Sequence, residues 1–454
     1  MAKRGGRTVL EKNRCVVVGA GAAGLAATYH LLRGGVEVVT LESSGEAGGR
    51  LLGGRHDGRV IDLGAQFFFR PYRTTFELCG RLGLEGQVVP FPFRVGLWRD
   101  GVLTALTAGL DPRTLAGNFR ELLRFRLLSP AGVARLTALL FLLLRRRRDL
   151  HFLRFPGNLD LDGRDLASFT LDGYGEEVLE YYLQPLVSCL TLGQPEEIGA
   201  GYGLALAWYA MQGCCTLKEG IWTLADRLHR ECRGSVRLST PAREIVIEAG
   251  KVRGVETEEG FLEAGEVVCC TSASAALRLM PRLPDGARSL LAKIGYSSCC
   301  HVVFGFPRRS FPAGWYAVAL PRRSGSSMAG FSDDSTKCPS YAPPGESLVH
   351  CFTFGAHARE LNAQPDRLVA ARLLEELRSW APSPPPDPLF RVVHRWEEAV
   401  CLPPPGTLRQ LRRLARELPQ TVRGLHLAGE YLYMPSVEGA LRSGMDAADE
   451  VLRS

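Results

Sequence analysis

Apolar and polar positions near the N-terminus follow one pattern that changes twice. A short β-branched run, Cys15–Val18, leads into a periodic apolar segment ending at Gly34, and a second β-branched run ends at Glu42. Short apolar runs bounded by turn residues are typical of buried strands, and apolar residues three or four positions apart indicate a helix. The pattern therefore predicts a strand–helix–strand unit with parallel strands.

Later patterns predict a mixture of helices and strands. We expect helices over residues 111–150 and 164–230, with a turn at 156–163. Alternating positions within residues 294–355 predict strands, and the periodic segment 364–380 predicts a helix. At 454 residues the chain is too long for one simple core and suits two domains.

The first predicted turn has the glycine spacing of a dinucleotide-binding motif. Gly19 permits a tight exit from the strand, Gly21 lets the backbone approach a ligand, and Gly24 lets the helix pack closely. The N–H groups of the new helix, which starts at Ala22 and Ala23, then face a pyrophosphate.

An acidic residue and a second glycine pair narrow the choice of dinucleotide. Glu42 stands where a carboxylate can accept hydrogen bonds from both hydroxyls of an adenosine ribose, and its charge disfavours NADP. Gly48, Gly49 and Arg50 follow at once and supply a second backbone approach. Two approaches fit the longer and more enclosed FAD.

These motifs resemble the flavin-dependent amine oxidase superfamily, which includes protoporphyrinogen oxidases, monoamine oxidases and carotenoid desaturases. In that family the Gly-Gly-Arg lies along the pyrophosphate and ribityl chain of non-covalent FAD, so Gly48, Gly49 and Arg50 are expected to do so. The resemblance implies an α/β fold, with a glutathione-reductase-like Rossmann domain and an interleaved α+β substrate domain.

The resemblance continues at Val60–Phe69, which is similar to the family's strand and turn beside the isoalloxazine ring. This similarity implies that Gly64, Ala65 and Gln66 lie at the cofactor. The segments 216–232 and 236–257 are similar to the family's return to the nucleotide domain. They imply a position beside the adenine for two residues, Ala242 and Arg243.

The last family-like segment is Leu425–Leu452. In the family, Glu430, which follows Gly429, contacts the ribityl or pyrophosphate region. A helix is expected to start near Val437 to Ala440, and its N-terminus would favour negative charge on the reduced flavin.

The order of these segments predicts two discontinuous domains. The FAD-binding domain is expected from residues 1–70, 214–275 and 420–454, and the substrate-binding domain from 71–213 and 276–419, with a helical arm at about 111–155.

Three residues are candidates for the chemistry. Gln66 is the polar group expected near the ring, and Trp396 lies in a motif that resembles the family's tryptophan strand beside the flavin. Many amine oxidases of the family place a lysine in the strand facing flavin N5, and that position falls on His301, or on Cys300 if the register slips by one. The nearest lysine along the chain is Lys293.

The segment 165–200 looks most like protoporphyrinogen oxidases and related desaturases. We therefore expect an FAD-dependent oxidoreductase that removes a hydride from a bulky, largely apolar substrate and passes electrons to oxygen or another acceptor. A small-amine oxidase that forms an imine and hydrogen peroxide is the alternative enzyme. A non-catalytic binder of a lipid or prenylated partner on the same fold is the alternative of another class.

Composition bears on partners and compartment. The net charge is +7, but no basic patch is interleaved with aromatic residues, so nucleic acid is not an expected partner. Many of the thirteen cysteines sit in apolar runs, no Cys-x-x-Cys occurs, and no metal-ligand constellation stands out. The first residues lack an apolar segment typical of a signal peptide. These features predict a cytoplasmic protein with reduced thiols and no metal.

One arginine-flanked apolar run, Leu136–Leu144, raises the question of membrane contact. Its nine residues fall short of the roughly twenty needed to span a bilayer. It is either a helix lying on an anionic surface at the inner face of a membrane or a helix packed inward beneath a solvated arginine cap.

Overall fold

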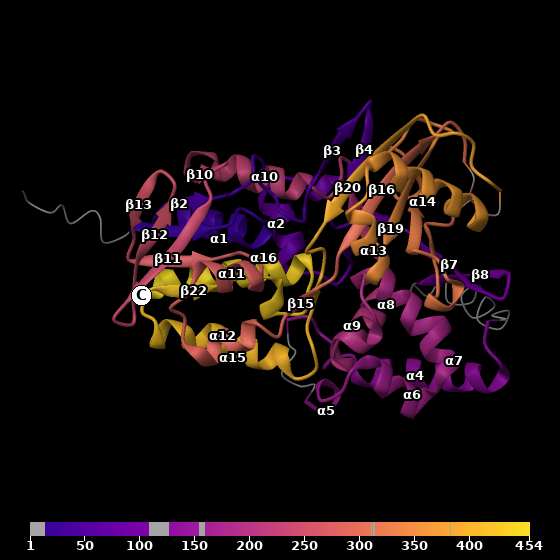
Figure 1. Cartoon of the computed structure of the whole chain (residues 1–454), viewed down its shortest axis with the longest axis horizontal. Coiled ribbons are helices and arrows are strands. Elements are labelled where there is room, and N and C mark those ends of the chain that lie inside the picture. Colours follow the sequence, from indigo (N-terminus) through magenta and orange to yellow (C-terminus); the bar gives the residue numbers. More distant parts are fainter. Residues whose placement is uncertain (1–13, 109–126, 154–158, 310, 312–313, 382) are drawn as a thin grey trace, which may run out of the picture. The chain divides into compact units, whose positions relative to one another are not determined.

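The computed structural model describes residues 14–108, 127–153, 159–309, 311, 314–381 and 383–454. The chain forms two compact units, each assembled from separated segments (Figure 1). Unit 1 comprises Met1–Leu52, Leu224–Ile294 and Thr407–Ser454, and unit 2 comprises Gly53–Thr223 and Gly295–Gly406.

Unit 1 is an α/β unit built on a five-stranded parallel sheet with the strand order β10-β2-β1-β14-β22. An antiparallel ribbon in the order β11-β12-β13 completes its strands. The strands and helices of unit 1 are β1 (Arg14–Val18), α1 (Ala22–Arg33), β2 (Glu37–Leu41), α10 (Thr223–Cys232), β10 (Val236–Arg237), β11 (Ala242–Glu248), β12 (Lys251–Thr257), β13 (Gly260–Glu263), β14 (Glu266–Cys269), α11 (Ala273–Leu279), α12 (Asp285–Leu291), α15 (Thr407–Thr421), β22 (Leu425–Leu427) and α16 (Val437–Arg453).

Close helix packing holds the centre of unit 1 together. Helices α1 and α16 pack against each other, and a Cβ atom at Gly444 of α16 would overlap the carbonyl oxygen of Ala23 in α1. The central strand β1 is almost wholly apolar and buried, as expected for a parallel strand covered on both faces. The expected strand–helix–strand unit is present as β1, α1 and β2, and the expected α/β architecture is confirmed.

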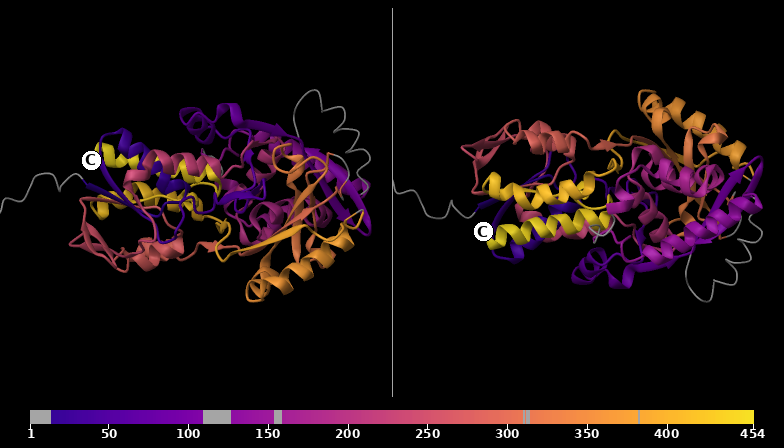
Figure 2. Two further views of the ribbon diagram at one scale, coloured as in Figure 1. Left: turned by 90° about the horizontal axis from the view of Figure 1, so that it is seen from above. Right: turned by 90° about the horizontal axis from the view of Figure 1, so that it is seen from below.

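Unit 2 contains a seven-stranded sheet in the order β20-β16-β19-β18-β17-β7-β8, in which only the β17–β7 pair is parallel. Its helices and three small sheets, β3-β4, β5-β9-β6 and β15-β21, complete an α+β unit (Figure 2). The strands of unit 2 are β3 (Gly53–His56), β4 (Arg59–Asp62), β5 (Phe68–Phe69), β6 (Val88–Phe91), β7 (Phe93–Arg99), β8 (Val102–Ala108), β9 (Cys214–Leu217), β15 (Gly295–Tyr296), β16 (Cys299–Phe306), β17 (Ala317–Ala319), β18 (Met328–Asp333), β19 (Ser347–Thr353), β20 (Phe390–Trp396) and β21 (Cys401–Leu402). Its helices are α2 (Thr74–Arg81), α4 (Pro130–Arg146), α5 (Leu159–Asp162), α6 (Leu166–Tyr174), α7 (Glu176–Val178), the π-helical turn η4 (Leu179–Leu183), α8 (Gln184–Thr191), α9 (Ala200–Ala210), α13 (Gly355–Asn362) and α14 (Asp366–Trp380).

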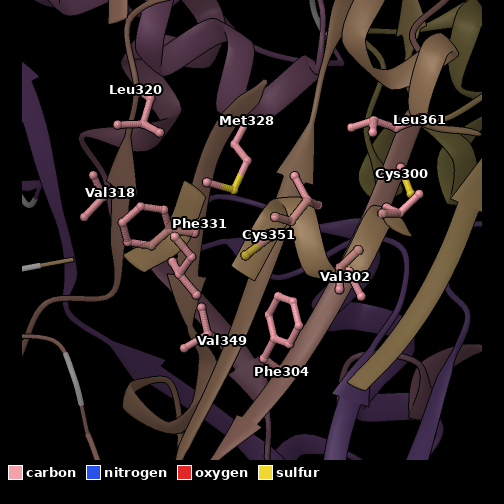
Figure 3. Close-up of a cluster of buried hydrophobic side chains, with 14 of the residues drawn as sticks. Cys300, Val302, Phe304, Val318, Leu320, Met328, Phe331, Val349, Cys351 and Leu361 are labelled. Atoms are coloured by element: carbon pink, nitrogen blue, oxygen red, sulfur yellow. The ribbon is translucent and has the colours of Figure 1, made fainter. Parts of the chain in front are cut away.

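Strand alternation gives the large sheet of unit 2 two different faces. Alternate residues of β16, including Val302 and Phe304, join Phe331 and Val349 in an apolar core that also receives buried residues of α14 (Figure 3). Because successive side chains of a strand point to opposite faces, His301 and Val303 lie on the other face. The apolar face stabilises the sheet, and the second face is free to carry polar groups.

The units begin and end at different residues from the expected domains. Residues 53–70 belong to unit 2, because β3 pairs with β4, and Val60 in β4 donates its N–H to the carbonyl of Tyr341. Residues 276–294 and 407–419 belong to unit 1, because α12 and α15 pack on each other.

Some expected elements differ from those observed. Residues 214–217, expected as helix, form β9, because this buried apolar run pairs with β5 and β6. Residues 109–126 of the expected arm and 156–158 of the expected turn lie outside the described residues, and 159–162 form α5. The helix expected over 364–380 is confirmed as α14. Among the described residues, no helix is both long and apolar enough to span a bilayer.

His426 links two strands and a helix of unit 1 through charge. It lies on β22, and its ring nitrogens are 2.7 Å from Glu266 Oε2 on β14 and 3.3 Å from Glu450 Oε2 on α16. Burial alone lowers the pKa of His426, but the hydrogen bonds and charges of the two glutamates raise it above its ordinary value. A doubly protonated ring can donate to both carboxylates.

We expect this link to make unfolding pH-dependent. Because the folded-state pKa is raised, the stabilisation is fully present below the unfolded value of about 6.5 and is lost as pH rises through the folded-state pKa. Thermal midpoints measured from pH 6 upwards should fall more steeply in the wild type than in His426→Gln. The exposed control His56→Gln should keep the wild-type slope, and equal slopes in all three proteins would contradict the assignment.

Candidate functional site

The three glycines of the first turn meet different surroundings in unit 1. Gly19 has φ +98°, and a Cβ atom there would lie 2.9 Å from the carbonyl oxygen of Cys270. A Cβ at Gly24 would overlap the carbonyl oxygen of Gly19. A Cβ at Gly21 would meet only Gly49 Cα, at 3.9 Å. The protein itself therefore needs glycine at two positions, and at Gly21 it leaves room for a side chain or a ligand.

A second turn lies against the first, backbone to backbone. Gly48 forms a parallel bridge with Gly21 and donates its N–H to Ala20 O at 2.9 Å, and a Cβ at Gly49 would lie 3.1 Å from Gly21 Cα. Helix α1 begins at Ala22, has no side-chain cap at Gly21 and carries no acidic residue in its first turn. This N-terminus fits an anionic group such as a pyrophosphate.

Glu42 is fixed beside these turns. Its Oε2 accepts from Ala20 N at 2.7 Å, and its Oε1 accepts from Ser44 N at 2.9 Å. Its backbone carbonyl accepts from Thr240 N at 2.8 Å, so the segment leading to Ala242 runs beside it. The carboxylate is thus held at the end of β2, the place where a dinucleotide ribose is bound in this fold class.

The other expected residues of unit 1 come from its last strand and its ribbon. Arg50 Nη1 lies 2.8 Å from Glu430 Oε1 and joins the second turn to the exit of β22. Arg243, at the start of β11, forms an ion pair with Glu258 on the surface of the ribbon. The glycine before Glu430, Gly429, has φ +154°.

Helix α16 starts at Val437, as expected, and Ala440 lies in its first turn. Its cap is Ser436, whose side chain accepts from Gly439 N at 3.0 Å. Glu438 is also in the first turn and is buried. This acidic residue already complements part of the helix dipole, so a negative charge on a ligand is not the sole partner of this N-terminus.

Three predicted residues of unit 2 meet at one turn between β4 and β5. The carbonyl of Leu63 accepts from Trp396 Nε1 at 3.0 Å and lies 2.9 Å from His301 Nδ1. Gln66 Nε2 donates to Asp62 O at 2.7 Å and to Gly64 O at 2.9 Å. The turn Gly64–Gln66, which includes Ala65, is therefore fixed by its own glutamine and by residues from β16 and β20.

Lys337 is part of the same assembly, and sequence reasoning missed it. Its side chain is 0% exposed, and Nζ donates to Gln66 O at 2.8 Å and lies 3.3 Å from Gln66 Oε1. Two carboxylates face the ammonium, Asp334 at 2.5 Å and Asp62 at 3.8 Å. A lysine was expected only within the strand that carries His301, and the nearest one along the chain is Lys293. Lys337 lies in a turn 36 positions after His301, so the strand pattern gave no indication of it. The one local signal was the Asp-x-x-Lys spacing from Asp334.

An aromatic cluster adjoins this turn. The ring of Phe67 is half-buried and contacts four others with centroid separations from 5.3 to 6.2 Å, namely those of Phe69, Phe91, Phe93 and Tyr316. Edge-to-face contacts of this kind hold the Phe67 ring in place against four buried rings.

Several known proteins are similar to this chain. A family model described as flavin containing amine oxidoreductase matches residues 22–452. Coproporphyrinogen III oxidase of Bacillus subtilis is 21% identical over 97% of this chain and 98% of its own length. The mitochondrial protoporphyrinogen oxidase of Nicotiana tabacum is 23% identical over 97% of this chain and 94% of its own. Cyclohexylamine oxidase from Brevibacterium oxydans has a similar fold, with a TM-score of 0.71 and 20% identity over 97% and 99% of the two chains.

The different surroundings of the glycines allow a sharp test of the nucleotide site. Gly21→Val should fold, because the protein leaves space there, but should purify depleted of FAD, since the side chain occupies the route of the pyrophosphate. Glu42→Ala should also lose FAD, because the ribose acceptor is removed. Flavin absorbance per protein measures both.

Gly24→Ala is the matched control for the first variant. Its methyl group would overlap the Gly19 carbonyl, so it should reduce soluble folded protein as well as flavin. Full flavin occupancy in folded Gly21→Val and Glu42→Ala would show that this turn does not bind the cofactor.

Proposed function

Because this chain belongs to the flavin containing amine oxidoreductase family and is an FAD-dependent oxidoreductase, we propose that it oxidises a bulky, largely apolar substrate of the porphyrinogen class. The enzyme assignment replaces the alternative of a non-catalytic lipid or prenyl binder. Bound FAD supplies the acceptor, N5, for a hydride taken from a carbon of the substrate.

The observation that carries this proposal is the extent of the likeness. The two porphyrinogen oxidases match over nearly the whole of this chain and of their own lengths. Phe67 is half-buried and is held by buried aromatic rings, so its accessible part can offer apolar contact to a bulky substrate. The similarity to an amine oxidase structure supports the shared fold.

The roles of the remaining site residues are also proposals. Both ring nitrogens of His301 are engaged, one with Leu63 O and the other with His350 Nδ1 at 3.0 Å. We therefore assign His301 and Trp396 to holding the Leu63 carbonyl, and Gln66 to the polar side of the turn. The final electron acceptor is proposed to be oxygen or another small oxidant.

A small-amine oxidase remains the second candidate, because the family includes such enzymes. Against it, the strand β16 carries His301 where many relatives of that activity are expected to carry a lysine. Burial and the neighbouring His350 lower the pKa of His301 well below its ordinary value, so the ring is neutral near pH 7 and supports oxygen activation less than an ammonium.

The two candidates predict different substrates. Under anaerobic conditions, coproporphyrinogen III or protoporphyrinogen IX should bleach the flavin absorbance, with one hydride passed to each flavin and one proton released. When oxygen is readmitted and reoxidises the flavin, three such two-electron oxidations of one substrate molecule should yield the fluorescent porphyrin. Putrescine and cyclohexylamine should leave the flavin oxidised. Bleaching by an amine and not by either porphyrinogen would overturn the proposal in favour of the amine oxidase.

A peripheral membrane contact is a further proposal, supported by helix α4. Phe141 is 65% exposed and Leu144 is 48% exposed, and exposed Arg145, Arg147 and Arg148 follow at the end of the helix. Exposed apolar side chains beside several cations suit an anionic lipid surface.

The burial of α4 also identifies which leucines to test. Leu143 is fully buried, so its replacement would damage packing, whereas Phe141 and Leu144 face outwards. Phe141→Ser/Leu144→Ser should sediment less with vesicles containing anionic lipid than the wild type, at unchanged flavin content. Leu389→Ser, which alters another exposed apolar residue, should sediment like the wild type. Equal sedimentation of all three proteins, or none for the wild type, would contradict membrane contact.

A further inference from the structure

Unit 2 buries a compact group of ionisable side chains behind the Gly64–Gln66 turn. It consists of Asp62, His301, Asp334, Lys337 and His350. The side chains of the two aspartates, the lysine and His350 are 0% exposed, and His301 is almost fully buried. Such a group is stable in a protein interior only if its charges and hydrogen bonds are matched.

The strand register brings the two histidines together. In β16 and β19, His301 pairs with Phe352 and Val303 pairs with His350. His301 and His350 therefore lie diagonally on the same face, opposite the apolar core formed by Val302 and its neighbours. Their imidazole rings are 5.0 Å apart between centroids.

The hydrogen bonds of this row fix where protons must be. The Leu63 carbonyl can only accept, so His301 Nδ1 carries a proton. If His301 is neutral, its Nε2 accepts, and His350 Nδ1, at 3.0 Å, donates. The other nitrogen, His350 Nε2, then points without a proton at Asp334 Oδ2, 3.4 Å away.

Two unshared electron pairs facing each other would repel, so one further proton is required at this contact. If His301 were instead doubly protonated, His350 would accept from it and carry its proton on Nε2. Both arrangements therefore hold one proton more than a group in which both imidazoles are neutral and Asp334 is ionised.

Charge matching leads to the same proton count. The ammonium of Lys337 is matched against two carboxylates, those of Asp62 and Asp334, which leaves one negative charge in excess. One additional proton makes the group neutral. Burial raises the pKa of Asp62 to about 6 despite the opposing effect of Lys337, and burial likewise raises the pKa of Asp334. Burial lowers the pKa values of both histidines, His350 lowers that of His301 further and Lys337 lowers that of His350 further. The extra proton therefore belongs to the carboxyl group of Asp334.

The titratable groups around the cluster do not alter this count. The Tyr316 and Tyr341 rings lie 5.8 and 5.4 Å from Lys337 Nζ, and burial raises the pKa of both phenols, so they stay protonated. Burial raises the pKa of the Cys214 thiol and lowers that of His394, so both stay neutral.

Asp333 is the remaining buried acid near the group. Its carboxylate accepts from both the N–H and the hydroxyl of Ser335, from the Ser347 hydroxyl and from the N–H of Leu348. It is therefore solvated by its own set of donors, although burial raises its pKa.

We propose that Asp334, Lys337 and His350 are positioning residues for the Gly64–Gln66 turn, and that their cluster works with one extra proton held between Asp334 and His350. Lys337 has three N–H groups, and two of them face Gln66 while the third faces Asp334. Loss of the extra proton at high pH leaves a buried negative charge that draws Lys337 away from Gln66. The consequence for turnover rests on the proposed function, but the proton count does not.

The test uses the full-length FAD-loaded protein and the variant Asp334→Asn. Both Lys337 Nζ and His350 Nε2 face Asp334 Oδ2. The asparagine removes one of the two negative charges, so Asp62 alone matches Lys337 and the variant group is neutral without an extra proton. On unfolding in weakly buffered guanidinium near pH 7.5, read with an indicator dye, the wild type should release about one proton more than Asp334→Asn. The exposed control Asp387→Asn should release as much as the wild type.

The same count appears in equilibrium unfolding. For each unit by which the pH rises near neutrality, the equilibrium constant for unfolding should increase by a factor about ten times larger in the wild type than in Asp334→Asn. Lys337→Met removes the cation, so it should release about one proton more than the wild type if it folds. Equal proton release by the wild type and Asp334→Asn would overturn the proposal.

A measurement on the wild type alone covers the case in which a variant fails to fold. In protein labelled with ¹⁵N-histidine, His350 Nε2 should show the chemical shift of a protonated or hydrogen-bonded nitrogen, with assignment from His350→Gln. The shift of a bare, unbonded nitrogen at neutral pH would overturn the proposal.

Turnover provides the positioning readout. The pH profile of kcat for the wild type should decline at high pH, and Asp334→Asn should shift that decline upward, because its cluster has no extra proton to lose. Coincident profiles would overturn the positioning role. Failure of porphyrinogen oxidation with an intact proton count would affect the proposed function alone.

Discussion

The close approach of two glycine turns is the constraint on which unit 1 depends. Gly49 can approach Gly21 backbone to backbone because it has no side chain, since a Cβ atom at Gly49 would lie 3.1 Å from Gly21 Cα, whereas a Cβ atom at Gly21 has room. The parallel pairing of β1 and β2 brings the first turn and Glu42 to one edge of the sheet, and the close packing of α1 on α16 keeps the helix N-terminus there. The result is a surface made of N–H groups and one carboxylate, which matches the phosphates and the ribose of FAD.

In unit 2, the alternation of strand residues gives the large sheet one face with an apolar core and one face with buried polar groups. One face of β16 and β19 contributes Val302, Phe304 and Val349 to an apolar core, and on the other face Val303 and Leu348 pack with Ile61. That second face can then carry His301 and His350, whose burial is offset by hydrogen bonds and by matched charges. These buried groups contact the Gly64–Gln66 turn and its neighbour Leu63, so the same hydrogen bonds also hold the turn.

The strand–helix–strand unit of unit 1 could be predicted from the sequence because its signals are local. The glycine spacing, Glu42 and the Gly48–Arg50 segment each occupy one turn or strand end, and the fold places them together through a single βαβ unit. The sequence predicted only some of the residues that lie near Gln66. Lys337 meets that residue through long-range strand pairing, and no short motif encodes such a contact.

The sequence also did not predict which residues of helix α4 are buried. Its apolar run was visible, but periodicity alone did not separate buried Leu143 from exposed Phe141, because nearly every position of the run is apolar. The domain boundaries shifted for a similar reason. Val60–Phe69 resembles a family segment associated with the cofactor, yet its strand β4 is hydrogen-bonded to Tyr341 of unit 2.

The central claim is that this chain takes a hydride from a carbon of a porphyrinogen and passes it to bound FAD. Its most direct test is the single-turnover, anaerobic rate of flavin bleaching by coproporphyrinogen III deuterated at its methylene bridges. The account predicts markedly slower bleaching than with the unlabelled compound, because the broken bond is then C–D. No bleaching by either compound, or bleaching at the same rate by both, would contradict it.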